Sequence, residues 1–217
     1  GCSMIRKETR FTGPRFAEFI FASGKLLANI TAILAGVGLI VGSLSGTGLG
    51  NSVSRDLVSL AGGHYLPLLF LGAITSFILG IGMTVTACYL FLATVLVPAL
   101  VQVGLNPMGC HLFVLYWGDL SYITPPVALA SITAAAIAGS DPMETGWKSI
   151  KLGAAKYIVP FFFAINPALI LKGDISVVFL AVVTALLGCI FLAASMEGFL
   201  YFQGNINMLQ RIISFAI

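Results

Sequence analysis

Long uncharged stretches dominate this chain, and short polar stretches separate them. No Asp, Glu, Lys or Arg occurs between Asp56 and Asp119, and further uncharged runs cover residues 26–54, 120–140, 157–171 and 175–196. A helix needs about 20 mostly apolar residues to cross a bilayer. The pattern therefore predicts an all-α, polytopic membrane protein with roughly six hydrophobic segments.

The first two predicted elements differ in character. Residues 5–25 mix basic and aromatic side chains, a composition typical of a helix that lies in the membrane interface. We therefore expect residues 1–25 to form a cytoplasmic, amphipathic connector at the membrane surface. Residues 26–46 are apolar and rich in Ala and Gly, small residues that let helices approach closely, and they predict the first spanning helix.

The next hydrophobic region carries a break. Residues 65–79 lead into Gly80 and Gly82, near Thr84 and Thr86, and an apolar run then resumes. Glycine weakens a helix, and non-helical backbone survives at membrane depth only where it is buried in protein or lines a wet cavity. The pattern predicts local unwinding here, and the alternative is a plain loop between two helices.

A second break starts at Ile123, in the sequence I-T-P-P. Thr124 precedes Pro125 and Pro126, which lack backbone donors, and a residue before proline is pushed out of the helical region. The apolar runs on either side are too short to cross at about 1.5 Å per residue. Two half-length segments joined by a break predict a re-entrant helical hairpin over residues 107–139.

Two broken elements at membrane depth indicate a transport site. Amino ends of half-helices attract anions, and freed backbone carbonyls coordinate sodium or similar cations. Asp119 either binds a cation or proton, as the rarity of intramembrane charge suggests, or caps a helix near the interface. Asn166, before Pro167, is either an interhelical hydrogen-bonding residue or a ligand.

Composition and charge narrow the function classes. The chain is 59% hydrophobic and 9% charged, against about 25% charged in soluble domains. The net charge of +3 is too small to indicate nucleic acid. Basic residues gather within residues 6–25 and 148–156, which places both stretches on the cytoplasmic side by the positive-inside tendency. Asp141 is the expected cap of an amphipathic helix there.

The sequence shows no pattern for catalysis or metal binding. No Ser-His-Asp, paired-carboxylate or H-E-x-x-H spacing occurs, and His64 and His111 lie far apart. The cysteines have no C-x-x-C spacing and are expected to be small buried thiols, namely Cys2, Cys88, Cys110 and Cys189. We therefore expect neither an enzyme, nor a metal centre, nor an organic cofactor.

Several motifs together resemble one family. They are H-L-F-V-x-Y from His111, I-T-P-P-V from Ile123, A-G-x-D-P-M-x-T-G from Ala138 and N-P-A-L from Asn166. The chain resembles the tripartite ATP-independent periplasmic (TRAP) transporter permeases, specifically the large, DctM-like part of the fused permease. Thr84 replaces the proline of the family's G-M-G-M-P-T-T segment, and Tyr122 stands where relatives often carry an acid.

This resemblance implies an elevator-type fold with inverted repeats, in which residues 26–217 form the second repeat and the remaining part of the permease is a partner. It implies sodium-driven uptake of organic acids across the bacterial inner membrane, with the carboxylate substrate delivered by a periplasmic substrate-binding protein. Sodium would bind near the two breaks, and the candidate ion or substrate residues are Gly82, Thr84, Thr86, Asp119, Ile123, Thr124, Pro125, Pro126 and Asn166.

Two other functions remain open at this point. One is an elevator-type ion or organic-anion symporter that works without a binding protein. The other is a structural membrane subunit that transports nothing. A gene for a secreted binding protein beside this reading frame would distinguish the first alternative from the TRAP interpretation.

Overall fold

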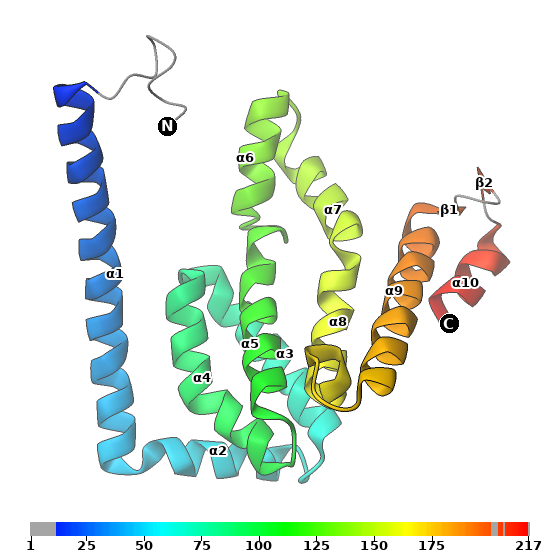
Figure 1. The fold of residues 1–217 in the computed structure, drawn as a ribbon, viewed down its shortest axis with the longest axis horizontal. Helices are drawn as coiled ribbons and strands as arrows, with labels where there is room; N and C mark the ends of the chain where they lie inside the picture. Colours follow the sequence, from blue (N-terminus) through cyan, green and yellow to red (C-terminus); the bar gives the residue numbers. More distant parts are fainter. Residues whose placement is uncertain (1–11, 201–203, 206, 217) are drawn as a thin grey trace.

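The computed structural model describes residues 12–200, 204–205 and 207–216, and these are almost entirely helical (Figure 1). Two short strands of two residues each, β1 and β2, pair antiparallel near the end of the described chain. The elements are α1 (Gly13–Thr47), α2 (Leu49–Leu60), α3 (Tyr65–Gly82), α4 (Val85–Gln102), α5 (Pro107–Asp119), η3 (Leu120–Tyr122), α6 (Leu129–Ala138), α7 (Pro142–Leu152), α8 (Ala154–Ile165), η4 (Pro167–Ile170), α9 (Ile175–Glu197), β1 (Phe199–Leu200), β2 (Gly204–Asn205) and α10 (Met208–Ala216).

Among the described residues, three helices are long and apolar enough to cross a membrane: α1 over Gly13–Leu44, α4 and α9. A fourth span results if α2 and α3, bent by 119° at their junction, count as one. The predicted all-α, polytopic membrane protein is confirmed. Fewer helices pass than the six hydrophobic segments because breaks divide several apolar segments into helices of 10–17 residues, such as α6 and α8.

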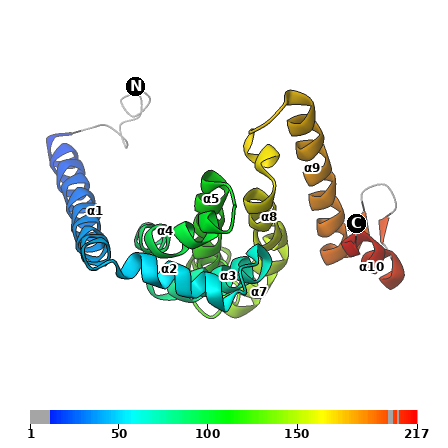
Figure 2. The same cartoon turned by 90° about the horizontal axis from the view of Figure 1, so that it is seen from below.

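Helix α1 stands at one side of the molecule, α9 and α10 stand at the other, and α3, α4, α5 and α8 lie between them (Figures 1 and 2). Helix α1 continues past residue 25, where we expected the connector to end and the spanning helix to begin. The structure has no interruption between the two. Residues 1–11 lie outside the described residues. The interfacial position of residues 1–25 stays a prediction.

The core forms where α3, α4 and α5 pack together. Its fully buried side chains come from all three helices and include Leu68, Leu69, Leu92, Leu100, Phe113 and Val114. Glycines make the packing close. A Cβ added at Gly80 of α3 would overlap the Gly118 carbonyl of α5, and one at Gly109 would overlap the Phe163 carbonyl of α8. Helix α5 is thus held on both sides by direct backbone approach.

Helices α3 and α4 form a hairpin. Helix α3 ends at Gly82, Met83 and Thr84 adopt extended backbone, and α4 returns alongside α3 (Figure 1). Local unwinding within a single span was the expectation for this stretch. The structure instead has the alternative, a short turn between two antiparallel helices.

The predicted hairpin over residues 107–139 does not form. Helix α5 leads through η3 into an irregular stretch, and α6 then continues away from α5 toward the opposite end of the molecule (Figure 1). The prolines interrupt helical hydrogen bonding without reversing the chain. The reversal comes at Gly139, whose left-handed backbone (φ 67°) ends α6, and α6 packs on α7. Helices α5 and α6 therefore form one broken span.

The lengths fit this description. Helix α5 has 13 residues and α6 has 10, so together they extend about 35 Å at 1.5 Å per residue. Neither alone reaches across a hydrocarbon core of about 30 Å. The two half-helices joined end to end are long enough to do so.

Helix α7 begins at the cap that the sequence predicts. The Asp141 carboxylate accepts a hydrogen bond from the backbone N–H of Glu144 at 2.8 Å, which confirms Asp141 as the cap. Exposed Lys148 forms an ion pair with Glu144 at 2.7 Å, and this hydrogen bond raises the pKa of Lys148. Gly153 separates α7 from α8.

Candidate functional site

The turn of the α3–α4 hairpin lies against the break between α5 and α6. A cavity of about 270 Å³ opens between them, and we call it the tip cavity. The hairpin and the break each supply four of the lining residues, which are Gly80, Ile81, Met83, Thr84, Ser121, Tyr122, Val127 and Leu129. The structure thus brings together two stretches of non-helical backbone that are about 40 positions apart in the chain.

A buried serine fixes the contact between these stretches. The Ser121 hydroxyl donates a hydrogen bond to the Gly80 carbonyl at 2.9 Å, with the Gly118 carbonyl as a second acceptor at 3.3 Å. Only 1% of Ser121 is exposed. Because the hydroxyl bridges two helices, the hairpin turn and the break are held in one fixed relative position.

Of the three hairpin residues predicted for the site, Thr84 lines the tip cavity. Its side chain accepts a hydrogen bond from the Ala87 N–H at 3.4 Å and so caps α4. Gly82 is the last residue of α3. Thr86 lies exposed in the first turn of α4 and is not a lining residue of the cavity.

Thr124 faces α8, not the tip cavity. Its hydroxyl donates to the Leu120 carbonyl at 2.7 Å and lies 2.5 Å from the Tyr157 hydroxyl. A threonine hydroxyl has a single proton, so Tyr157 is the donor in their contact. From the sequence we expected Thr124 and Thr86 to lie near one sodium site. In the structure, Thr124 contacts α8 and neither residue lines the tip cavity.

The neighbours of Thr124 also pack on α7 and α8. A Cβ added at Gly153 would lie 2.6 Å from the Ile123 side chain, and one added at Gly146 would lie 2.8 Å from Pro125. The peptide bond between Pro125 and Pro126 is cis. These glycines leave the space that the I-T-P-P stretch occupies.

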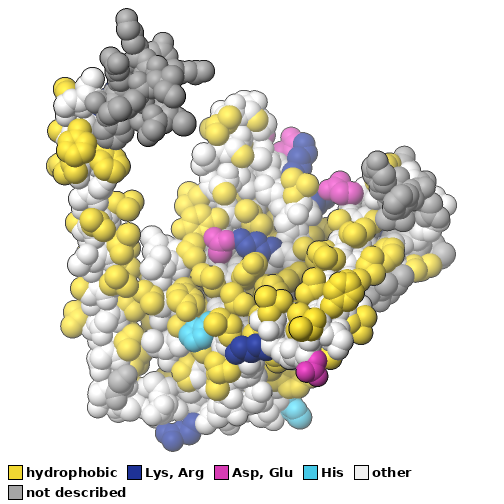
Figure 3. Space-filling model, in the orientation of Figure 1, with side chains coloured by type: hydrophobic (Ala, Val, Ile, Leu, Met, Phe, Trp, Pro, Cys, Tyr) yellow, Lys and Arg dark blue, Asp and Glu magenta, His cyan; other side chains and the backbone are white. Residues whose placement is uncertain are grey.

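Asp119 forms an ion pair with Lys156 of α8, and the two side chains are 36% and 28% exposed. Asp119 makes no side-chain capping hydrogen bond to η3, so the capping alternative does not describe it. Figure 3 shows an acidic and a basic side chain in contact at mid-height on a largely hydrophobic face. Lys156, which the sequence analysis counted among the loop lysines, belongs to this region instead.

Asn166 lies away from the two breaks. Its side chain accepts a hydrogen bond from the Ala168 N–H at 3.0 Å and caps η4. It follows Lys156 by ten positions, which is roughly 15 Å along α8. The polar side chain is therefore a local helix cap, and the structure does not place it with the tip cavity.

Four residues of this region were not predicted as site residues, namely Ser121, Tyr122, Lys156 and Tyr157. Lys156 stands at the very start of a long uncharged run. A lysine in such a position needs a charge partner, and Asp119 is the one acid between residues 57 and 140. Those two facts indicate that each of these charges needs a partner, but only the fold pairs them with each other.

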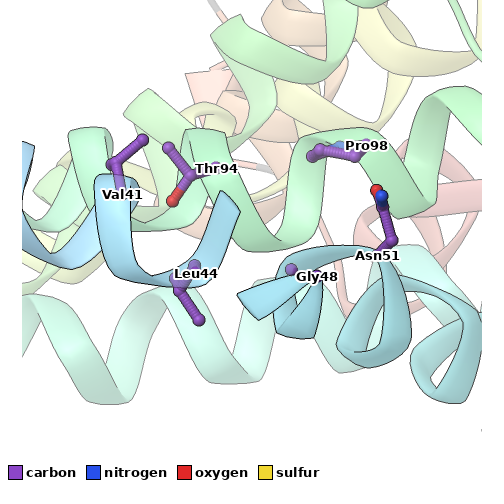
Figure 4. A pocket seen from close by; sticks show the side chains of 7 residues that line it. Val41, Leu44, Gly48, Asn51, Thr94 and Pro98 are labelled. Carbon is purple, nitrogen blue, oxygen red and sulfur yellow. The ribbon is translucent and has the colours of Figure 1, made fainter. Parts of the chain in front are cut away.

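A second cavity of about 330 Å³ lies among α1, α2 and α4 (Figure 4). Its lining residues are Val41, Leu44, Gly48, Gly50, Asn51, Thr94 and Pro98. All but Gly48 belong to helices, whose backbone carbonyls are mostly occupied by helical hydrogen bonds. The tip cavity, which non-helical backbone borders on two sides, is the better candidate for ion binding.

Within the described part of the chain, no three His, Cys, Asp or Glu side chains could share a metal ion. Cys88 and Cys110 are buried free thiols, as predicted, Cys189 is half-buried, and Cys2 lies outside the described residues. His111 Nδ1 lies 3.1 Å from the Tyr89 hydroxyl.

The model of one protein family matches residues 3–177, which include both breaks, the tip cavity and α8. Its description is "Tripartite ATP-independent periplasmic transporter, DctM component". No curated protein and no solved structure matches the chain.

Proposed function

This chain belongs to the DctM component family of the tripartite ATP-independent periplasmic transporters. We propose that it is part of a permease that takes up organic acids together with sodium. The observation that carries this proposal is the tip cavity, where two interrupted membrane elements meet. Broken elements of this kind hold substrates and coupling ions in secondary transporters. The substrate class and the coupling ion are what the family resemblance implies, and the tip cavity is where we propose that both bind.

The helix ends around the tip cavity suit a carboxylate together with a cation. The amino ends of α4 and α6 border it through Thr84 and Leu129, and the carboxyl ends of α3 and η3 border it through Ile81 and Tyr122. Amino ends favour anions, and carboxyl ends favour cations. A sodium ion at the carboxyl ends would offset the charge of a carboxylate at the amino ends.

Oxygen atoms in the cavity would hold the sodium ion. Hard cations require several oxygen ligands at once, and we propose that Thr84 and Tyr122, which line the cavity, supply hydroxyl oxygens beside backbone carbonyls of the hairpin turn. Ser121 instead supports these groups, because its hydroxyl already bridges Gly80 and Gly118.

The family name describes a transporter of three parts. We propose that this chain works with the other parts as its partners. A periplasmic substrate-binding protein would deliver the carboxylate, and the remaining part of the permease would complete the transport path in the bacterial inner membrane. The chain by itself would not transport, and its broken elements would move with the rest of an elevator-type domain.

The test is uptake of labelled organic acids by the full-length permease in proteoliposomes, with an imposed sodium gradient and with or without the binding protein. Uptake should require both. Thr84→Val should raise the half-saturating sodium concentration about fivefold, the equivalent of roughly 1 kcal/mol for one hydroxyl ligand. Thr133→Val is the matched control, since Thr133 is exposed on α6 and bonds only within its own helix.

Three results would count against the proposal. Uptake without any sodium dependence would remove the coupling ion, and equal uptake without the binding protein would favour a symporter that acts alone. No change in the sodium requirement of Thr84→Val relative to Thr133→Val would remove Thr84 from the ion site.

A further inference from the structure

The break between α5 and α6 has a second set of contacts, separate from the lining of the tip cavity. Asp119 pairs with Lys156, and Thr124 hydrogen-bonds Tyr157. Lys156 and Tyr157 are consecutive residues of α8, and Tyr157 also contacts Trp117 edge-to-face, with ring centroids 6.0 Å apart. One short segment of α8 thus occupies both polar groups that the break directs toward it.

The charge arrangement explains why such contacts are needed. Asp119 carries a carboxylate at the end of a stretch of 62 residues without any charged side chain. An unpaired carboxylate close to a sodium-binding cavity would attract cations itself. With Lys156 bound to Oδ2 of this carboxylate, the pair is neutral and one of its oxygen atoms already has a cationic partner.

We infer that Lys156 and Tyr157 are positioning residues that withhold Asp119 and Thr124 from the transported cation, so that cation binding is confined to the tip cavity. The inference rests on the proposed function, because it concerns the same broken elements. In this arrangement Lys156 acts as a tethered cation that belongs to the protein. Tyr157 acts on Thr124 in the same way through a hydrogen bond.

Removing one partner of the pair should have a different effect from removing both. Lys156→Gln leaves a carboxylate without its partner, which small cations can then bind with little selectivity. Asp119→Asn leaves an unpaired ammonium group, which no added cation can compensate. Replacing both with neutral amides removes both charges, and breaking a partly buried pair is more damaging than replacing it whole.

The experiment measures the melting temperature of the purified full-length permease in sodium, potassium and choline chloride at equal ionic strength. We expect Lys156→Gln to melt several degrees lower in choline and to recover part of the loss in both sodium and potassium. Asp119→Asn should melt lower in all three salts. The double variant should melt closer to the wild type than either single variant and should respond to sodium as the wild type does.

The exposed Glu144–Lys148 pair of α7 is the matched control, because its side chains are 66% and 69% exposed. Glu144→Gln, Lys148→Gln and their combination should change the melting temperature little and should add no response to potassium. If Lys156→Gln yields no folded protein but the double variant does, that rescue demonstrates the same coupling.

Two outcomes would overturn the inference. The losses of the two single variants could simply add in the double variant, or folded Lys156→Gln could show no new response to potassium. Failure of the proposed function looks different. In that case sodium does not raise the melting temperature of the wild type, and uptake does not require sodium. The double variant in choline still melts closer to the wild type than the single variants do.

Discussion

Gly80→Ala should destabilise the protein, although alanine is the better helix former. Gly80 lies near the end of α3, where its Cα faces the Gly118 carbonyl of α5 so closely that an added Cβ would overlap it. The Gly80 carbonyl also accepts the hydrogen bond of buried Ser121 at 2.9 Å. A methyl group there must push α3 and α5 apart, because backbone atoms cannot rotate away as a flexible side chain can.

The magnitude follows from three opposing or additive effects. Overpacking in a well-packed core costs about 1–3 kcal/mol. Loss of the Ser121 hydrogen bond adds about 1 kcal/mol. The higher helix propensity of alanine returns about 1 kcal/mol. The net destabilisation is therefore about 1–3 kcal/mol, which lowers a melting temperature by about 2–4 °C per kcal/mol in a chain of 150–250 residues.

The assay is thermal unfolding of the purified permease, with Gly36→Ala and Gly188→Ala as matched controls. Both control glycines lie inside helices, in α1 and α9, and nothing within 4 Å would meet their added Cβ atoms. These controls should be neutral or stabilised by up to about 1 kcal/mol. A melting temperature of Gly80→Ala equal to those of the controls would refute the close approach of α3 and α5.

Three further predictions concern other parts of the structure. Cysteines at Asn106 and Ser140 should label from opposite sides of the membrane in the full permease, because α5 and α6 continue in one direction; labelling from one side would restore the re-entrant hairpin. Gly146→Val should reduce uptake more than expression, since its side chain would displace Pro125; unchanged uptake would contradict this packing. Arg211→Gln should speed amide hydrogen exchange at the end of α9, whose last carbonyls accept two guanidinium hydrogen bonds, and Arg211→Lys should restore less than half of the protection.

Much of the fold was predictable because its causes are local in the sequence. Uncharged runs of sufficient length specify membrane helices, Asp141 is a favourable cap for α7, and prolines and glycines interrupt helices wherever they occur. The positions of both breaks were therefore predicted, and the family resemblance placed one sodium site near both of them. Whether a break reverses the chain was not: the first break is the loop that had been the alternative, and the second continues as a broken span where a hairpin was expected.

Local sequence is ambiguous here because a proline only removes helical hydrogen bonds. The direction of the next helix depends on the surface that it finds to pack against, and α6 finds α7 because Gly139 turns the chain back. For α3 and α4 the two-residue turn at Met83 and Thr84 is enough, since both helices pack on α5. Contacts between distant segments thus decide what the breaks become.

The sequence by itself determined that this is a helical membrane protein of the DctM family with two interrupted elements, because apolar length, glycine, proline and the motifs are all read locally. Only the tertiary structure decided which polar groups meet. It turned Thr124 toward Tyr157, left Thr84 on the tip cavity, and paired Asp119 with Lys156 across 37 positions of the chain. The physical reason is helix register. The approach of Gly80 to Gly118 sets how α3 and α5 align, the approach of Gly109 to Phe163 sets how α5 and α8 align, and these alignments set which side chains face each other.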